Sequence, residues 1–171
     1  MINLINEENY FDDKKEIDLN ALIENLNSIF DSAMQVTNQT YSPLSMSLQF
    51  VSKSQIQSLN LKVRQIDKTT DVLSFPSLDI NCGEVIDKNN FPYDIDEITK
   101  ELNIGDCIIC YDIAKEQAQE YNHSIMREIC YLFVHSVLHL LGFDHIKDID
   151  KKVMREKEEQ ILNALNITRN L

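Results

Sequence analysis

The sequence predicts an α+β domain in which a small mixed β-sheet packs with about five α-helices around one central helix that carries histidines. Two observations predict this fold class. Strand-like runs and amphipathic helical segments follow one another along the whole chain. Residues 124–141 are apolar nearly all round, as expected of a buried helix. The length of 171 residues, with three glycines and three prolines, fits one domain without flexible linkers, so we expect residues 1–171 to form a single domain.

Three elements are expected near the N-terminus. Residues 2–5 are expected to form the first strand. Asp18 can cap the first helix, because the apolar residues that follow it recur with a helical period as far as Ala33. Residues 45–50 alternate polar and apolar side chains, which predicts a strand with one buried face.

A second helix and two further strands are expected next. Ser52 and Gln55 have the spacing of a capping box, which predicts a helix start. The inner face of this helix is expected to carry Ile56, Leu59 and Val63. Residues 70–75 predict a strand that ends at Pro76, and residues 106–111 predict another.

The segment between those two strands, residues 77–105, is acidic and irregular, and it is long for a loop without structure. A short helix over residues 96–102 is expected to occupy part of it. Further helices are expected from about residue 113, over residues 124–141 and over residues 150–165. Helices and strands in this order make the α+β domain.

The net charge of −12 counts against non-specific binding of nucleic acid, which depends on neutralising phosphates with lysine and arginine. The charge is unevenly distributed, however. Residues 53–68 contain the cations Lys53, Lys62, Arg64 and Lys68 against one acid, Asp67. Such a basic patch can hold a short single strand of nucleic acid on an otherwise acidic protein.

No apolar run approaches the roughly 20 residues of a membrane span, and the N-terminus lacks the basic start of a signal peptide. A cytoplasmic protein without a membrane partner is expected. The cysteines are Cys82, Cys107, Cys110 and Cys130. Cys107 and Cys110 have the C-x-x-C spacing, but residues i and i+3 of a strand point to opposite faces and cannot share a metal or a disulfide. We expect reduced thiols in the core.

Three of the four histidines, His135, His139 and His145, fall within one short hydrophobic stretch. On a helix, positions i and i+4 share a face, so the first two imidazoles can converge on one point. Gly142 is typical of a left-handed helix end and would let the chain deliver His145 to the same point. A purely structural role in the core is less favoured for all three histidines, because each buried imidazole would need its own hydrogen-bond partner. Three imidazoles with a fourth position open are the ligand set of a catalytic zinc.

The same spacing occurs in the zinc-binding pattern of a large group of metalloproteases, H-E-x-x-H-x-x-G-x-x-H. One position differs, because Ser136 stands where those proteases have the glutamate that acts as general base. The pattern therefore predicts a hydrolytic zinc site for a substrate other than a peptide, with its general base unassigned.

Two blocks of residues carry a resemblance to a known family. The first is Leu59-Asn60-x-x-x-Arg64-x-x-Asp67-Lys68-x-Thr70-Asp71-Val72-Leu73-Ser74-Phe75-Pro76, and the second runs from Gly105-Asp106 through Arg127-Glu128 to Asp144-His145. In order and spacing, most of the chain resembles the YbeY family of bacterial rRNA maturation factors, which are single-strand-specific endoribonucleases. The family usually has glycine where this chain has Ser136.

The resemblance implies one zinc ion per chain, held by His135, His139 and His145, and it implies that Arg64 is a catalytic residue in the same cleft. It also implies cleavage of single-stranded RNA in the maturation of the 3′ end of 16S rRNA and in ribosome quality control. The small ribosomal subunit and its assembly proteins are the expected partners, and DNA is not. Two alternatives stay open: a zinc hydrolase for another substrate, including peptides, and a non-catalytic ribosome assembly factor with a stabilising zinc.

Four other residues are candidates for supporting roles. Glu128 lies two helical turns before the first histidine and can hydrogen-bond a ligand or buried backbone. Asp144 can support the third histidine or form a turn, and Asp71 can cap the strand that follows it. His123 lacks a partner at a suitable spacing and is expected to be exposed.

Overall fold

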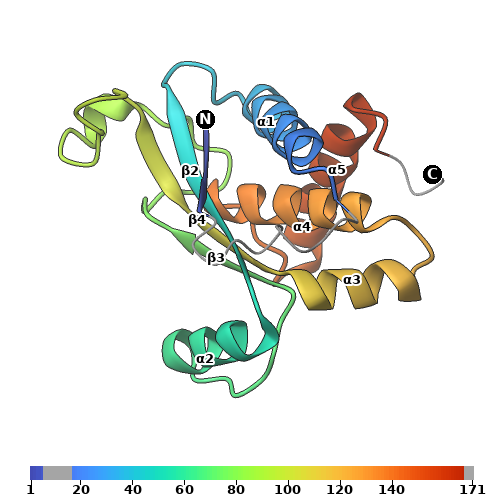
Figure 1. The fold of residues 1–171 in the computed structure, drawn as a ribbon. Coiled ribbons are helices and arrows are strands. Elements are labelled where there is room, and N and C mark those ends of the chain that lie inside the picture. Colours follow the sequence, from blue (N-terminus) through green and yellow to red (C-terminus); the bar gives the residue numbers. More distant parts are fainter. Residues whose placement is uncertain (6–16, 168–171) are drawn as a thin grey trace.

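The computed structural model describes residues 1–5 and 17–167 (Figure 1). The strands are β1 (Ile2–Ile5), β2 (Leu44–Val51), β3 (Val72–Pro76) and β4 (Leu102–Cys110). They form one sheet in the order β1-β2-β4-β3. β1, β2 and β4 are parallel, and β3 runs antiparallel to β4 at the edge. The expectation of a small mixed sheet in an α+β domain is therefore confirmed.

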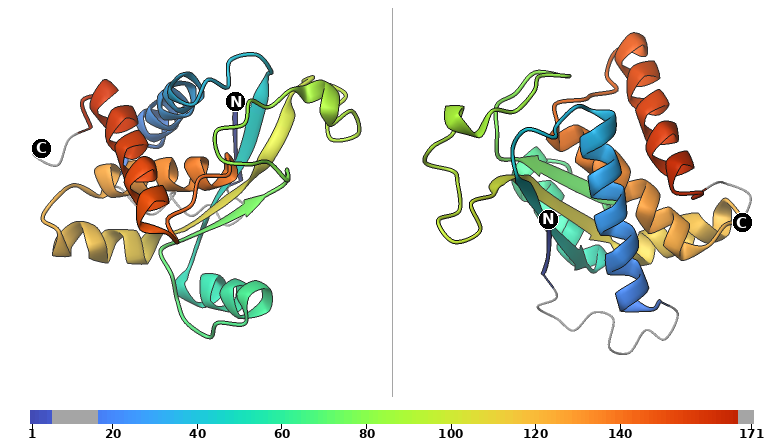
Figure 2. Two further views of the ribbon diagram at one scale, coloured as in Figure 1. Left: turned by 180° about the vertical axis from the view of Figure 1, so that it is seen from behind. Right: turned by 90° about the horizontal axis from the view of Figure 1, so that it is seen from above.

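One helix lies at the centre of the others. The helices are α1 (Leu19–Val36), α2 (Lys53–Arg64), α3 (Tyr111–Glu120), α4 (Ile125–Leu140) and α5 (Asp148–Ala164). α4 contacts α1, α3, α5, β3 and β4, and Figure 2 shows it passing between α1 and α5. Ile129, Phe133 and Val137 on α4 are fully buried. The prediction of a buried central helix is confirmed.

Local capping signals explain where three helices begin. The Asp18 carboxylate accepts hydrogen bonds from two backbone N–H groups in the first turn of α1. Ser52 and Gln55 form the expected capping box at the start of α2. The Ser124 hydroxyl accepts from the N–H of Arg127 at 3.2 Å and caps α4. These side chains satisfy N–H groups that lack partners inside the helix.

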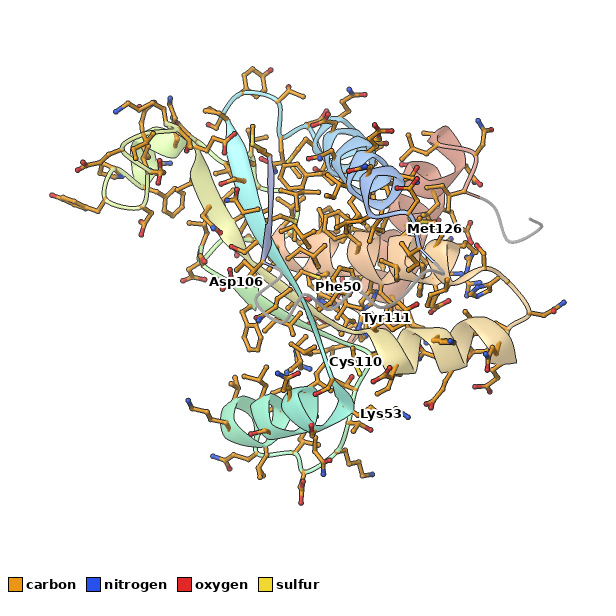
Figure 3. All side chains as sticks on the ribbon, in the orientation of Figure 1. Phe50, Lys53, Asp106, Cys110, Tyr111 and Met126 are labelled. Carbon is orange, nitrogen blue, oxygen red and sulfur yellow. The ribbon has the colours of Figure 1, made fainter. Side chains whose placement is uncertain are left out.

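Side chains of β4 alternate between the two faces of the sheet. Cys107 lies in the main core with α4, whereas Cys110 belongs to a smaller cluster with Ile56 of α2. Figure 3 shows Cys110 where β4 passes into α3, close to α2. The two cysteines therefore lie on opposite faces, as predicted, and burial raises the pKa of the Cys107 thiol to about 12. Cys82 is exposed, so the expectation of a core thiol is wrong at that position.

The expected helix over residues 96–102 is wrong, because a turn and a strand take its place. The Asp96 carboxylate accepts from the N–H groups of Ile98 and Thr99 at 2.9 and 2.7 Å. This local hydrogen bonding competes with helix formation. Leu102 then begins β4, four residues before the expected start of that strand at residue 106.

The burial of β2 follows the expected alternation from Met46 to Phe50, with Ser47 and Gln49 partly exposed, although Ser45 is buried as well. One expectation about α2 differs from the structure. On α2, Ile56 is buried but Val63 is 54% exposed. The second cluster contains Ile56 and Leu59 but not Val63, so the last turn of α2 does not share in that packing.

Candidate metal centre and adjacent clefts

A tight turn at the end of α4 brings the third histidine back to the first two. Gly142 has a φ of +80°, a conformation that L side chains rarely adopt. Its N–H donates to the carbonyl of His139 at 3.1 Å, and the N–H of Phe143 donates to the carbonyl of Leu138 at 3.0 Å. A Cβ at Gly142 would lie 2.9 Å from the carbonyl oxygen of Ile80. Glycine is therefore required here by both conformation and space.

The three imidazoles converge as the spacing suggested. His135 and His139 lie one turn apart on α4, and His145 lies in the segment that leads to α5. The ring of His145 is centred 5.3 Å from that of His135 and 5.0 Å from that of His139. One nitrogen from each of the three rings lies within 4.8 Å of the others. The trio can hold a metal ion.

The donor atoms fit a small metal ion. Nε2 of His135 and Nε2 of His139 are 3.1 Å apart. Two imidazole nitrogens at about 2.0–2.1 Å from one tetrahedral zinc ion lie about 3.3 Å apart. Burial, together with the neighbouring His135 and His145, lowers the pKa of the His139 imidazole to about 4. The ring is therefore neutral at physiological pH, which is the form that binds metals.

Glu158 of α5 contacts the histidine trio, and the sequence analysis did not identify it. Its Oε1 lies 2.7 Å from Nδ1 of His135, across 23 residues of chain. A proton on Nδ1 is donated to this carboxylate, which leaves Nε2 free to bind a metal. Glu158 is buried, in the same row of α5 as Met154 and Leu162. A charged residue on the apolar face of an amphipathic helix was the signal that could have identified it.

We expect Glu158→Gln to weaken metal binding by about 10- to 100-fold, the usual effect of losing a residue that orients a metal ligand. The amide keeps the size of the side chain but cannot act as a charged acceptor for the Nδ1 proton. Competition with a chromophoric chelator measures the change. Glu156→Gln is the matched control, because Glu156 is an exposed acid on the same helix that pairs with Lys152. Equal metal affinities in the two variants would contradict the role of Glu158.

Ser136 faces the sheet. It is fully buried, and its hydroxyl lies 2.9 Å from that of Ser74 on β3. The Cys107 thiol also hydrogen-bonds with Ser136. This position therefore joins α4 to the sheet, and its small side chain is set by the packing there.

Two clefts lie along α4. The metal cleft, of about 510 Å³, runs between α4 and α5 and is lined by His135, His145 and the cations Arg127, Lys151 and Arg155, among others. The side cleft, of about 550 Å³, runs between α4, α3 and the start of β3 and is lined by Asp71, Gln117, Tyr121, Arg127, Glu128 and Tyr131, among others. Two of the three histidines, His135 and His145, thus line a cleft that also carries three cations.

In the structure, Arg64 does not line the metal cleft. Arg64 is the last residue of α2 and is exposed, and it is not among the residues that line the metal cleft. Its role in catalysis stays a prediction. The next residue, Gln65, has a φ of +60° and turns the chain toward β3.

The other candidates have local partners. The Asp71 carboxylate accepts from the N–H of Val72 and from the amide of Gln117 on α3, so it does cap β3. Asp144 accepts from the N–H of His145 at 2.7 Å, as expected of a turn residue. Both contacts fix the backbone close to the two clefts.

The expectation that His123 is exposed is wrong. Its side chain is 5% exposed, and Nε2 lies 2.9 Å from Oε2 of Glu128. The same nitrogen lies 3.0 Å from the guanidinium of Arg127. His123 precedes α4 and folds back over its first turn, a packing that no spacing in the sequence indicates. Glu128 is thus paired with His123.

Sequence comparisons with known proteins all point to the same family. The family model described as Endoribonuclease YbeY matches residues 6–166. A protein named Endoribonuclease YbeY from Clostridium botulinum strain Hall is 40% identical over 167 residues, which cover 94% of this chain and 99% of the relative. A protein of the same name from Caldicellulosiruptor bescii is 48% identical over 124 residues, which cover 72% of this chain and 75% of the relative.

One solved structure has the same fold. The solution structure of TM1509 from Thermotoga maritima matches with a TM-score of 0.54 and 21% sequence identity, over 97% of this chain and 92% of that one. At this level of identity the likeness concerns the fold.

Proposed function

This chain belongs to the YbeY family of endoribonucleases, and we propose that it cleaves single-stranded RNA with one zinc ion held by His135, His139 and His145. The observation that carries this proposal is the convergence of the three imidazoles beside a cleft with three cations. Three neutral nitrogen ligands with one position left for water or substrate are typical of catalytic zinc. Bound zinc would lower the pKa of a water ligand and stabilise negative charge on the cleaved phosphate.

The protein's own residues have separate tasks in this proposal. Glu158 holds the Nδ1 proton of His135 and so fixes the ring for metal binding. Arg127, Lys151 and Arg155 attract the RNA phosphates into the metal cleft. Arg64 contacts the RNA backbone at or near the scissile phosphate, where the RNA strand passes the end of α2. The general base is not assigned to a side chain.

The biological substrate in this proposal is rRNA, with maturation of the 3′ end of 16S rRNA and ribosome quality control as the processes. Small ribosomal subunits and their assembly proteins are the proposed partners, and the cytoplasm is the proposed location. The net charge of −12 supports a protein partner, because phosphate contacts alone add little binding affinity for RNA to an acidic protein. Among the described residues, no helix is both long and apolar enough to cross a bilayer.

The direct test combines metal analysis with a cleavage assay. We expect about one zinc per chain in purified protein, and we expect cleavage of an end-labelled single-stranded RNA that stops on chelation and returns with added zinc. The same RNA annealed to its complement should remain intact. Stoichiometric zinc without any cleavage would instead favour the assembly-factor alternative.

Ser136→Glu distinguishes this proposal from a peptidase. If the metalloprotease glutamate were all that is missing, this change would create proteolysis. We expect instead no cleavage of casein by either protein and a loss of stability of about 3 kcal/mol or more in the variant, because the new carboxylate would be buried without a counter-charge. Denaturant unfolding measures the loss. Ser136→Ala is the control and should cost only about 1 kcal/mol, the usual value of one hydrogen bond. Casein cleavage by the natural protein would overturn the ribonuclease proposal.

A further inference from the structure

The two clefts along α4 share a wall. Arg127 and Tyr131 line both the metal cleft and the side cleft. They lie one helical turn apart, and the Arg127 guanidinium carbon is 5.7 Å from the centre of the Tyr131 ring. A ligand that lies against the metal cleft can therefore extend past these two side chains into the side cleft without leaving the surface of α4.

The side cleft contains buried polar atoms that have no partner. Arg127 is 8% exposed, and its Nε–H makes no hydrogen bond among the described residues. Across the cleft on α3, Oε1 of Gln117 is likewise buried and unpartnered, while its amide nitrogen donates to Asp71 at 2.9 Å. The two residues line the same cleft, and each has a polar atom without a partner among the described residues. Buried polar groups normally have partners, so this pair points to a ligand with an acceptor and a donor of its own.

Charge distinguishes the kind of ligand that each cleft suits. The metal cleft has three cations, Arg127, Lys151 and Arg155, against the two carboxylates of Glu158 and Glu159, and this excess of positive charge suits phosphate. The side cleft has one arginine against the two carboxylates of Asp71 and Glu128, and its histidine, His123, lies 2.9 Å from Glu128. This balance disfavours an anion.

The side cleft also has aromatic side chains. Tyr121 lines it together with Tyr131 of the shared wall, and Tyr121 is 62% exposed. Proteins bind single-stranded RNA by stacking splayed bases on such rings and by hydrogen-bonding the edges of the bases. A nucleobase fits this cleft in three respects. It has a donor and an acceptor on its edge for the unpartnered atoms of Arg127 and Gln117, it carries no charge, and its flat face can stack on a tyrosine ring.

We propose that the side cleft binds one nucleobase of the RNA, from a nucleotide next to the phosphate held in the metal cleft. Arg127 donates from Nε to an acceptor on the base, Gln117 accepts from a donor on the base, and Tyr121 or Tyr131 stacks on its face. This inference rests on the proposed ribonuclease function and adds a substrate subsite to it. The subsite would make cleavage depend on a base as well as on the backbone.

The test uses RNAs that differ in one base. A short labelled single-stranded RNA with one cleavage position is compared with versions in which the nucleotide on either side of that position is abasic. Fluorescence anisotropy in the presence of a chelator gives the Kd without cleavage. We expect one of the two abasic RNAs to bind about 10-fold more weakly, within the range reported for loss of one stacked base. The other abasic RNA should bind with nearly unchanged affinity.

Variants of the protein test whether the side cleft causes this difference in RNA affinity. Gln117→Leu should weaken binding of the intact RNA by about the same factor and should no longer distinguish the intact from the abasic RNA. Tyr121→Ala, at an exposed position, is a second variant with the same expected pattern and little risk to folding. Gln119→Leu is the matched control, because Gln119 is exposed on α3 and does not line the side cleft.

Two results would overturn the base subsite: equal affinities of natural protein for all three RNAs, or full abasic sensitivity in both Gln117→Leu and Tyr121→Ala. A failure of the proposed function would look different. In that case the natural protein with zinc would leave the intact RNA uncleaved, whatever the Kd values are.

Discussion

Replacing His139 with alanine is expected to remove most of the bound zinc and to reduce RNA cleavage below detection. His139 is the middle ligand of the trio, and its Nε2 lies 3.1 Å from that of His135. Loss of one nitrogen from three leaves a site with two protein ligands, which is too few for a stable zinc site. Inductively coupled plasma mass spectrometry gives the zinc content, and a single-stranded RNA assay gives the rate.

The fourth histidine provides the control for this experiment. His123→Gln should retain about one zinc per chain, because its Nε2 lies beside Arg127 and Glu128 rather than beside the other histidines. The double variant with alanine at both His135 and His139 should carry no zinc. Full zinc occupancy in that double variant would show that the metal is bound elsewhere, and the assignment of the trio would then be wrong.

Replacing Arg64 with alanine is expected to slow RNA cleavage by roughly 100-fold or more, the scale for losing one donor to the charge of the transition state. Zinc content should be unchanged. Stability should change by no more than about 0.5 kcal/mol, because Arg64 is exposed at the end of α2. Arg64→Lys should restore only part of the rate, because an ammonium group cannot reproduce the planar guanidinium.

Lys62→Ala is the matched control for Arg64, since Lys62 is an exposed cation in the same last turn of α2. It should reduce cleavage far less and should act mainly through the salt dependence of RNA binding. Natural rates in Arg64→Ala would assign phosphate binding to the cations of the metal cleft instead. Alanine at Lys151 or Arg155 would then be expected to have the larger effect.

Much of the fold could be predicted from local patterns. The period of apolar residues and the caps at Asp18 and Ser52 mark the starts of α1 and α2, and the apolar run over residues 124–141 marks α4. Residues 2–5 form β1 as expected. These signals are local because capping and side-chain periodicity involve residues only a few positions apart. The wrong helix at residues 96–102 is the converse case, since an equally local turn at Asp96 competed with it.

The approach of the three histidines was also encoded locally. The i, i+4 spacing on α4 and the left-handed Gly142 bring the rings together within eleven residues of sequence. No long-range contact is needed to make that turn, and so a motif sufficed to find the trio.

By itself, then, the sequence determined the α+β class, the central helix and the clustered imidazoles, because each depends on residues close together in the chain. Only the tertiary structure decided which side chains surround that cluster. Glu158 reaches His135 from another helix, and Gln117 meets Asp71 across 46 residues. These two contacts arise because elements distant in sequence pack together, and burial then selects a partner for each polar group. His123 is a local case that the sequence also left open, because its ring folds back over the first turn of the helix that follows it. A charged residue in a sequence does not show whether it will face water or a histidine.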